Sequence, residues 1–136
     1  MNEIEEGLAP RIDFAKLRKV GSGGFEVIPV VLQDADSGEV LWVAYANEEA
    51  LRETLRTGRA VLFSTSRGEL WRKGETSGDW LAIAEVRVNC EQNSLLYRVR
   101  PQGEGVCHTR DPVTGKHRAR CFYRRLAADG AALEPV

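Results

Sequence analysis

Short runs rich in apolar and β-branched residues dominate the chain and predict a protein built mainly from β-strands. Two such runs span residues 27–33 and 40–45, and the polar segment 34–39 between them has the turn residues of a β-hairpin. Four further runs are expected to form strands, and they cover residues 60–64, 69–73, 80–89 and 94–100. The pattern therefore predicts a sheet of short strands connected by turns.

The run 80–89 alternates between apolar and polar residues, as a strand with one buried face does. The residues predicted to share its apolar face are Ala82, Ala84, Val86 and Val88. Cys90 would continue that face, so a buried thiol is the simplest structural interpretation of this cysteine.

The segment that follows Asn47 is the clearest helix. Asn47 is a favourable N-cap, acidic residues occupy the first turn, and the helix is expected to run to about Thr57 before stopping at Gly58. Leu51 and Leu55 are predicted to form its buried edge. We expect this helix to have a structural role.

The N-terminal part of the chain carries weaker signals. Residues 1–10 are acidic and expected to be frayed, whereas residues 12–19 have apolar positions at helical spacing after Asp13, a candidate cap. About seven short strands and one strong helix favour a β-dominated α+β domain.

Composition narrows the classes of protein. The 136 residues suit one domain with its own core, and 19 lysines and arginines balance 20 aspartates and glutamates. A formal net charge of −1 argues against a nucleic-acid-binding protein. No apolar run is long enough to span a membrane, and residues 1–7 lack the apolar core of a signal peptide. We therefore expect a soluble cytoplasmic protein with reduced thiols.

Three cysteines carry the strongest chemical signal, and they are Cys90, Cys107 and Cys121. An odd number of cysteines without an export signal argues against a disulfide framework, whereas three thiolates suit one zinc ion with a fourth position open to water. His108 could be the fourth ligand of a closed structural site or a proton shuttle beside the water. The spacings of 16 and 13 residues fit no common zinc finger, so three separate buried thiols are the alternative.

The segment 64–80 is a second dense group of polar residues. It combines hydroxyl groups, cationic side chains and glycines, which together suit a phosphate-binding loop. The candidate substrate-binding residues are Ser64, Ser66, Arg67, Arg72, Lys73, Glu75, Thr76 and Ser77. Trp71 and Trp80 offer surfaces on which a base can stack. The alternative is a pair of ordinary polar turns between strands.

Together these two groups resemble the phosphoribosyl-AMP cyclohydrolases, enzymes of histidine biosynthesis that open the adenine ring of their substrate. The resemblance extends from about Phe25 to Leu126. It rests on SRGELWRKGETSG at 66–78, CHT at 107–109 and CFYRR at 121–125. Because LWRKGETSG is highly specific and the cysteines occur in the family's order, the resemblance favours the zinc interpretation.

The resemblance implies a zinc-dependent hydrolase that cleaves the N1–C6 bond of N1-(5-phosphoribosyl)-AMP. It assigns Cys90, Cys107 and Cys121 as zinc ligands and His108 as the active-site histidine. It also implies a homodimer whose zinc sites lie at the interface, with cysteines from both chains. The implied fold is a buckled mixed sheet that forms a pseudo-barrel, accompanied by one or two short helices.

The same resemblance divides the chain into three parts. Residues 1–24 are expected to form an N-terminal tail with a short helix, residues 25–126 the cyclohydrolase-like domain, and residues 127–136 a C-terminal tail.

The residues around the first cysteine depart from the family pattern. The family usually has three aspartates there, which bind magnesium, whereas this chain has Asn89, Glu91 and Asn93. Magnesium prefers hard anionic oxygens in strict octahedral geometry, so one carboxylate and two neutral amides make a poor site. We expect the magnesium site to be weak or absent.

A second departure is the insertion 111–117, which lengthens the segment between Cys107 and Cys121 beyond the family's usual spacing. Pro112 and Gly115 predict a turn, so the insertion is expected to be an excursion on the surface. His117 is interpreted as a solvated loop residue and not as a ligand.

Three functions are consistent with these residues. The first is the histidine-pathway cyclohydrolase with a relaxed magnesium requirement. The second is a paralogue that uses the same zinc site to hydrolyse or deaminate a different purine-like nucleotide. The third, a non-catalytic zinc-stabilised binding module, is least favoured, because a structural site has no need to keep His108, Arg67 and Arg72 together.

Overall fold

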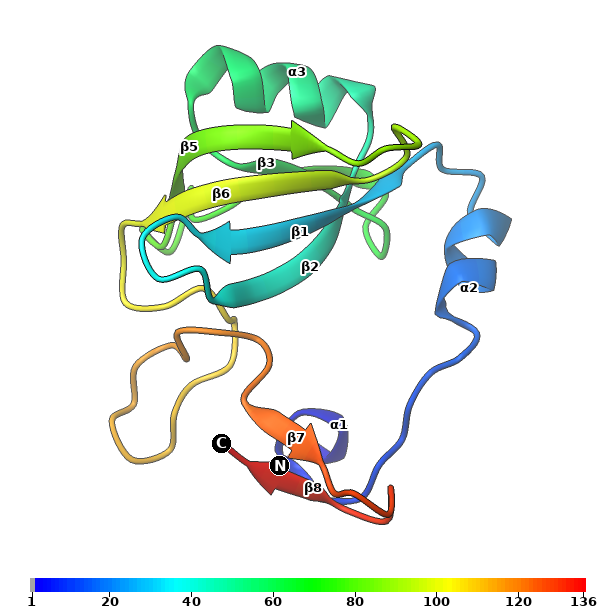
Figure 1. The fold of residues 1–136 in the computed structure, drawn as a ribbon, viewed down its shortest axis with the longest axis vertical. Helices are drawn as coiled ribbons and strands as arrows, with labels where there is room; N and C mark the ends of the chain where they lie inside the picture. Colours follow the sequence, from blue (N-terminus) through cyan, green and yellow to red (C-terminus); the bar gives the residue numbers. More distant parts are fainter. Residues whose placement is uncertain (1) are drawn as a thin grey trace.

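The centre of the molecule is a four-stranded mixed sheet, seen in a computed structural model that describes residues 2–136 (Figure 1). Its strands are β1 (Ile28–Asp34), β2 (Val40–Ala46), β5 (Leu81–Val88) and β6 (Leu95–Pro101), in the order β2-β1-β6-β5. The two central strands β1 and β6 run parallel, and each has an antiparallel partner at the edge. The β-dominated α+β class is thus confirmed, but the sheet is open at β2 and β5 and does not close into a barrel.

A second layer covers this sheet. It consists of the hairpin β3 (Val61–Ser64) and β4 (Glu69–Arg72) together with the helix α3 (Glu48–Thr57), which lies across the top of the view in Figure 1. The core between the layers is apolar and almost fully excluded from solvent. Its largest buried side chains include Tyr97, Leu32, Leu62, Leu81 and Val30.

Local sequence explains the hairpin between β1 and β2. The Oδ1 atom of Asp34 accepts hydrogen bonds from the backbone N–H groups of Asp36 and Ser37, at 2.8 and 2.9 Å. Gly38 completes the turn with a φ of 79°, which a residue with a side chain rarely adopts. The predicted hairpin is confirmed, with one residue added at the end of each strand.

The helix α3 has the predicted caps. The side chain of Asn47 accepts a hydrogen bond from the backbone N–H of Ala50 at 2.8 Å, and Gly58 ends the helix in the left-handed conformation with a φ of 71°. The predicted buried edge is wrong for Leu55, which is 62% exposed. The helix instead buries Ala50 and Thr54, because the Thr54 hydroxyl bonds to both the N–H and the C=O of Val61 in β3.

The predicted apolar face of β5 is also partly wrong. A β-bulge shifts the register between Ile83 and Glu85, so side chains after the bulge point to the face opposite from that of simple alternation. Leu81, Ile83 and then Val86 therefore meet the core, whereas Val88 is exposed. The thiol of Cys90, expected to be buried, is likewise exposed.

The two ends of the chain pack on one another, below the main sheet in Figure 1. They contain α1 (Glu3–Glu6) and the antiparallel pair β7 (Arg124–Leu126) and β8 (Leu133–Pro135), and the backbone N–H of Leu133 donates to the carbonyl of Leu8 at 2.8 Å. Residues 1–10, expected to be frayed, thus include a helix whose segment joins the C-terminal hairpin. The helix expected at 12–19 begins later, as α2 (Lys16–Ser22).

Within residues 2–136, no helix combines the length and the apolar character needed to cross a membrane.

The buried second layer yields the first testable prediction. Leu62→Ala removes a side chain with 0% exposure and should lower the free energy of unfolding by about 2–5 kcal/mol, because a cavity remains in the core. Leu55→Ala is the matched control, and its 62% exposed side chain should change stability by no more than about 0.5 kcal/mol. Urea unfolding followed by tryptophan fluorescence measures both. Equal losses in the two variants would contradict this placement of α3.

Candidate active site

A cavity of about 440 Å³ brings the two predicted groups of residues together. One wall is formed by β4 and the loop after it, and the other by Cys107, His108 and His117. Seven of the nine predicted substrate-binding residues line this cavity: Arg67, Trp71, Arg72, Lys73, Glu75, Thr76 and Ser77. Cationic and hydroxyl groups therefore face a thiol and two imidazoles across a space large enough for a small organic ligand.

The remaining two predicted residues do not line the cavity, since Ser64 ends β3 and Ser66 lies in the turn between β3 and β4. The Ser64 hydroxyl accepts a hydrogen bond from the backbone N–H of Arg67 at 3.3 Å and contacts the Ser66 hydroxyl at 3.3 Å. The two serines thus shape the turn that carries Arg67.

The loop after β4 is held tightly against the following strand. Gly74 has a φ of 79°, and a Cβ atom at this position would overlap the backbone of Trp80. The edge of Trp71 packs on Trp42 with ring centroids 5.1 Å apart, which fixes the indole at the cavity wall. The residues that follow Gly74 in this loop, Glu75, Thr76 and Ser77, line the cavity.

Lys73 is the most buried cation of this site, with 7% exposure. Burial lowers the pKa of its ammonium group, and the negative charges of Asp79 and Cys107 oppose that shift. Lys73 thus lies near the Asp79 carboxylate and the Cys107 thiol and adds positive charge to the lining of the cavity.

Cys107 and Cys121 form a thiol pair. A hydrogen bond from Cys121 lowers the pKa of Cys107 to about 5 against the opposing effect of burial, and Thr109 and His108 add to the lowering. The same hydrogen bond, together with burial, raises the pKa of Cys121. One thiolate that shares a proton with a second thiol is the donor chemistry that a soft metal ion selects. The pair therefore fits two of the three predicted zinc ligands.

Cys90 does not join this pair. It lies in the exposed turn between β5 and β6, and residues 2–136 contain no group of three or more His, Cys, Asp or Glu side chains placed to hold a metal ion. Within one chain, Cys90 is therefore separate from the Cys107–Cys121 pair.

The same turn contains the three residues predicted to form a degenerate magnesium site. The side-chain oxygen of Asn89 accepts hydrogen bonds from the backbone N–H groups of Asn93 and Ser94, both at 2.9 Å. The Asn93 oxygen accepts from the Asn89 amide at 2.7 Å, and the Asn93 amide donates to Glu91 at 3.2 Å. The oxygen atoms that a cation needs are thus engaged in building the turn.

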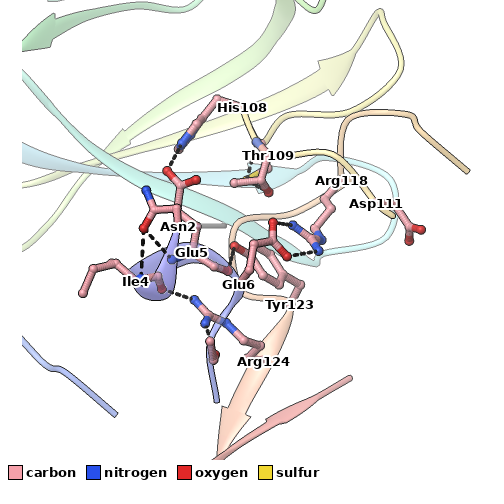
Figure 2. Close-up of polar contacts among 12 residues, drawn as sticks. Asn2, Ile4, Glu5, Glu6, His108, Thr109, Asp111, Arg118, Tyr123 and Arg124 are labelled. Atoms are coloured by element: carbon pink, nitrogen blue, oxygen red, sulfur yellow. Dashed lines mark hydrogen bonds and ion pairs between the residues drawn. The ribbon is translucent and has the colours of Figure 1, made fainter. Parts of the chain in front are cut away.

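His108 lies at the rim of the cavity and meets the N-terminal segment. Its Nε2 atom is 2.7 Å from the Oε1 atom of Glu5, in α1 (Figure 2). Since a carboxylate accepts hydrogen bonds, this contact places the ring proton on Nε2 and leaves Nδ1 as the basic nitrogen.

Residues near the C-terminus hold α1 in this position. Arg118 forms a bidentate ion pair with Glu6 at 3.0 and 3.1 Å, and the Tyr123 hydroxyl donates to the carbonyl of Glu5 at 2.7 Å (Figure 2). Arg124 donates to the carbonyls of Ile4 and Gly7. The N-terminal segment is therefore part of the wall around His108, which the sequence pattern did not indicate.

The prediction that His117 is solvated is wrong. Its side chain is 17% exposed, and its Nδ1 atom lies 2.5 Å from the Oδ2 atom of Asp79, which is itself 4% exposed. The predicted turn near Pro112 and Gly115 does form, since the backbone N–H of Gly115 donates to Asp111 at 2.8 Å. The tip of the insertion is exposed, but the backbone pairing of His117 with Arg110 brings His117 back to the site.

Comparison with known proteins gives the class of this site. The sequence profile of phosphoribosyl-AMP cyclohydrolases matches residues 42–123, more than half of the chain. The phosphoribosyl-AMP cyclohydrolase of Brucella anthropi is 46% identical over 129 residues, which are 93% of this chain and 79% of the relative. That of Hyphomonas neptunium is 50% identical over 100 residues, which are 74% of this chain and 70% of the relative.

A third relative is larger. The histidine biosynthesis bifunctional protein HisIE of Thermus thermophilus is 52% identical over 100 residues, which are 74% of this chain but only 43% of that protein. The chain thus spans less than half of the bifunctional relative.

These matches make the chain a hydrolase. More particularly, it belongs to the phosphoribosyl-AMP cyclohydrolase family, as the resemblance in its sequence indicated.

Proposed function

We propose that the protein hydrolyses the N1–C6 bond of N1-(5-phosphoribosyl)-AMP in histidine biosynthesis, with one zinc ion per chain. The observation that carries the proposal is the single cavity shared by the cationic loop, Cys107 and His108. Relatives named for this activity and the name of the bifunctional relative support the substrate and the pathway.

The zinc ligands in this proposal are Cys107 and Cys121 of one chain and Cys90 of a second copy. The thiol pair is already formed within one chain, whereas Cys90 is exposed at the far end of β5 and available to a partner. A zinc ion held by these thiolates would lower the pKa of a bound water molecule toward about 7 and would thereby supply the nucleophile.

The chain's own residues then have distinct tasks. His108, oriented by Glu5, takes a proton from the attacking water through Nδ1. Arg67, Arg72 and Lys73 bind the anionic phosphates, with Thr76 and Ser77 as hydrogen-bond donors. Trp71 provides an apolar face for the base, and Glu75 accepts hydrogen bonds from the nucleotide.

The activity itself is tested by complementation. Expression of this chain in a histidine auxotroph that lacks the cyclohydrolase should restore growth without histidine, and the purified protein should turn over N1-(5-phosphoribosyl)-AMP. Cys107→Ser should abolish both results, because a neutral hydroxyl poorly replaces a thiolate on zinc. A protein that is folded and zinc-loaded yet inactive on this nucleotide would favour the paralogue that acts on a different purine-like nucleotide.

The shared zinc site makes a second prediction that depends on which chain supplies each cysteine. The Cys90→Ser and Cys107→Ser variants should each lose zinc and activity when alone. After unfolding and refolding together, they should recover about one quarter of wild-type activity, since half of the dimers are mixed and each mixed dimer holds one complete site of two.

The control for this experiment is a mixture of Cys107→Ser and Cys121→Ser. These two cysteines come from the same chain in the proposed site, so no mixed dimer contains a complete set and no activity should return. Recovery in the control mixture, or none in the first, would rule out a zinc ion shared in this way. Zinc content measured in the same samples should follow activity.

The turn between β5 and β6 generates a prediction about magnesium. We expect protein freed of metal with EDTA to regain full turnover on zinc alone, because Asn89 and Asn93 use their side-chain oxygens within the turn. Replacing Asn89, Glu91 and Asn93 together by aspartate should create a response to magnesium. Binding of magnesium to the unmodified protein at low micromolar concentration, measured by calorimetry, would contradict the expectation.

A further inference from the structure

The insertion 111–117 is an ordered hairpin whose base lies at the active site. His117 pairs with Arg110 across the two arms, and the backbone N–H of Asp111 donates to the carbonyl of Lys116 at 2.8 Å. The neighbouring N–H of Arg118 donates to the carbonyl of Thr109 at 3.0 Å. The hairpin therefore continues directly from the segment that carries Cys107 and His108.

The close approach of two segments fixes where His117 lies. A Cβ atom on Gly105 would overlap the carbonyl oxygens of His117 and Arg118, and a Cβ atom on Gly103 would overlap Asp79. Glycine at both positions lets the chain after β6 pass between Asp79 and the insertion. As a result, a carboxylate from the loop before β5 meets an imidazole from the insertion.

The side chains of Asp79 and His117 are largely buried, and the direction of the hydrogen bond between them follows from the charge of Asp79. Burial raises the pKa of Asp79, but hydrogen bonds from His117 and from the backbone N–H of Glu104, at 2.7 Å, bring the pKa below its ordinary value. The carboxylate is thus ionised and can only accept, so Nδ1 of His117 donates to it. The Nε2 atom is the other ring nitrogen, and His117 is one of the residues that line the cavity.

The charges around His117 come from several elements. Asp79 contacts its ring, and Lys73, which lies near Asp79, lines the same cavity. Glu104 accepts a hydrogen bond from the backbone N–H of His117 at 3.2 Å. Arg110, on the opposite arm of the hairpin, lies 3.8 Å from the same Glu104 carboxylate. Asp79 is the one of these groups that is hydrogen-bonded to the ring.

We propose that His117, oriented by Asp79, is a second proton-transfer residue of this active site and protonates N1 as the N1–C6 bond breaks. The proposal rests on the cyclohydrolase activity proposed above. His108 and His117 line the same cavity. In this proposal His108 is the base that takes a proton from water, and His117 is the acid that protonates the leaving nitrogen N1.

The step balances without any further reactant. The oxygen of water forms a bond to C6 and becomes the carboxamide oxygen, while the electron pair of the N1–C6 bond stays on N1. His117 gives its Nε2 proton to N1. One proton of the water reaches the exocyclic nitrogen, and the other returns to His117 by way of His108 and solvent.

The decisive variant is His117→Asn. The asparagine amide can keep the hydrogen bond to Asp79 at the position of Nδ1, so the hairpin should remain folded, but no transferable proton remains at the position of Nε2. We expect kcat to fall by about 10²- to 10⁴-fold with KM nearly unchanged, as for the loss of a general acid. Asp79→Asn should also lower kcat, because an amide no longer selects one ring tautomer.

Lys116→Asn is the matched control, since it makes the same replacement at the adjacent, exposed position of the same hairpin. It should leave kcat and KM at wild-type values. If His117→Asn keeps wild-type kcat, or if it raises KM alone, the proton-transfer role is overturned, and the second result assigns His117 to substrate binding. A wild-type protein inactive on phosphoribosyl-AMP overturns the proposed function together with this inference, whereas a His117→Asn variant with wild-type kcat overturns only the inference.

A spectroscopic measurement tests the pair independently of activity. The chain has only 2 histidines, so the imidazole signals of the 15N-labelled protein arise from His108 and His117 alone, and His117→Asn assigns them. We expect a downfield Nδ1 proton from His117 that disappears in Asp79→Asn and persists in Lys116→Asn. Absence of this proton from the wild-type protein would overturn the orienting role of Asp79.

Discussion

The parallel pairing of β1 with β6 is the constraint on which the rest of the structure depends. It aligns Val30 with Leu95 and continues through Leu32 and Tyr97, side chains with no exposed surface at the centre of the core. Parallel neighbours cannot be joined by a tight turn, so the intervening chain must make a long excursion. That excursion includes α3, the β3–β4 hairpin and the loop 73–80 that contributes to the lining of the cavity. The end of β6 then delivers the chain past Asp79 to Cys107.

The buried charged groups near Asp79 are stabilised by contacts with groups of opposite charge or with hydrogen-bond donors. Asp79 is 4% exposed and Lys73 7% exposed, and an isolated charge at either position would carry a large desolvation cost. The carboxylate accepts from His117 and from the Glu104 backbone, while the ammonium lies near Asp79 and Cys107. A carboxylate, an ammonium group, an imidazole and a thiolate thus stabilise one another beneath the cavity. The contacts that offset the desolvation cost of Asp79 also fix the orientation of the His117 ring.

The three cysteines lie in two separate parts of the chain. Cys107 and Cys121 already share a proton, whereas Cys90 lies in an exposed turn beyond β5. The two chain ends join through α1, β7 and β8 and form a small unit beside the main sheet (Figure 1). Cys121 precedes β7 and is exposed, whereas its partner Cys107 is buried. The dimer proposed above would bring the exposed Cys90 of one chain to the thiol pair of the other.

The sequence by itself determined the elements whose causes are local. The β1–β2 hairpin follows from Asp34 and Gly38, and the ends of α3 follow from Asn47 and Gly58, because each cap or turn involves residues only a few positions apart. The motif at residues 66–78 likewise indicated the family and most of the residues that line the cavity. Tertiary structure decided the rest.

The bulge in β5 changes which face of the strand meets the core, because it adds one residue to the alternation. Leu81 and Ile83 face the core before the bulge, where Ala82 and Ala84 were predicted, and the predicted Val86 faces the core after it. His117 meets Asp79 across 38 positions of sequence, and His108 meets Glu5 across 103. No periodicity or local spacing encodes contacts of that range. They arise only when the core has formed and brought the segments together.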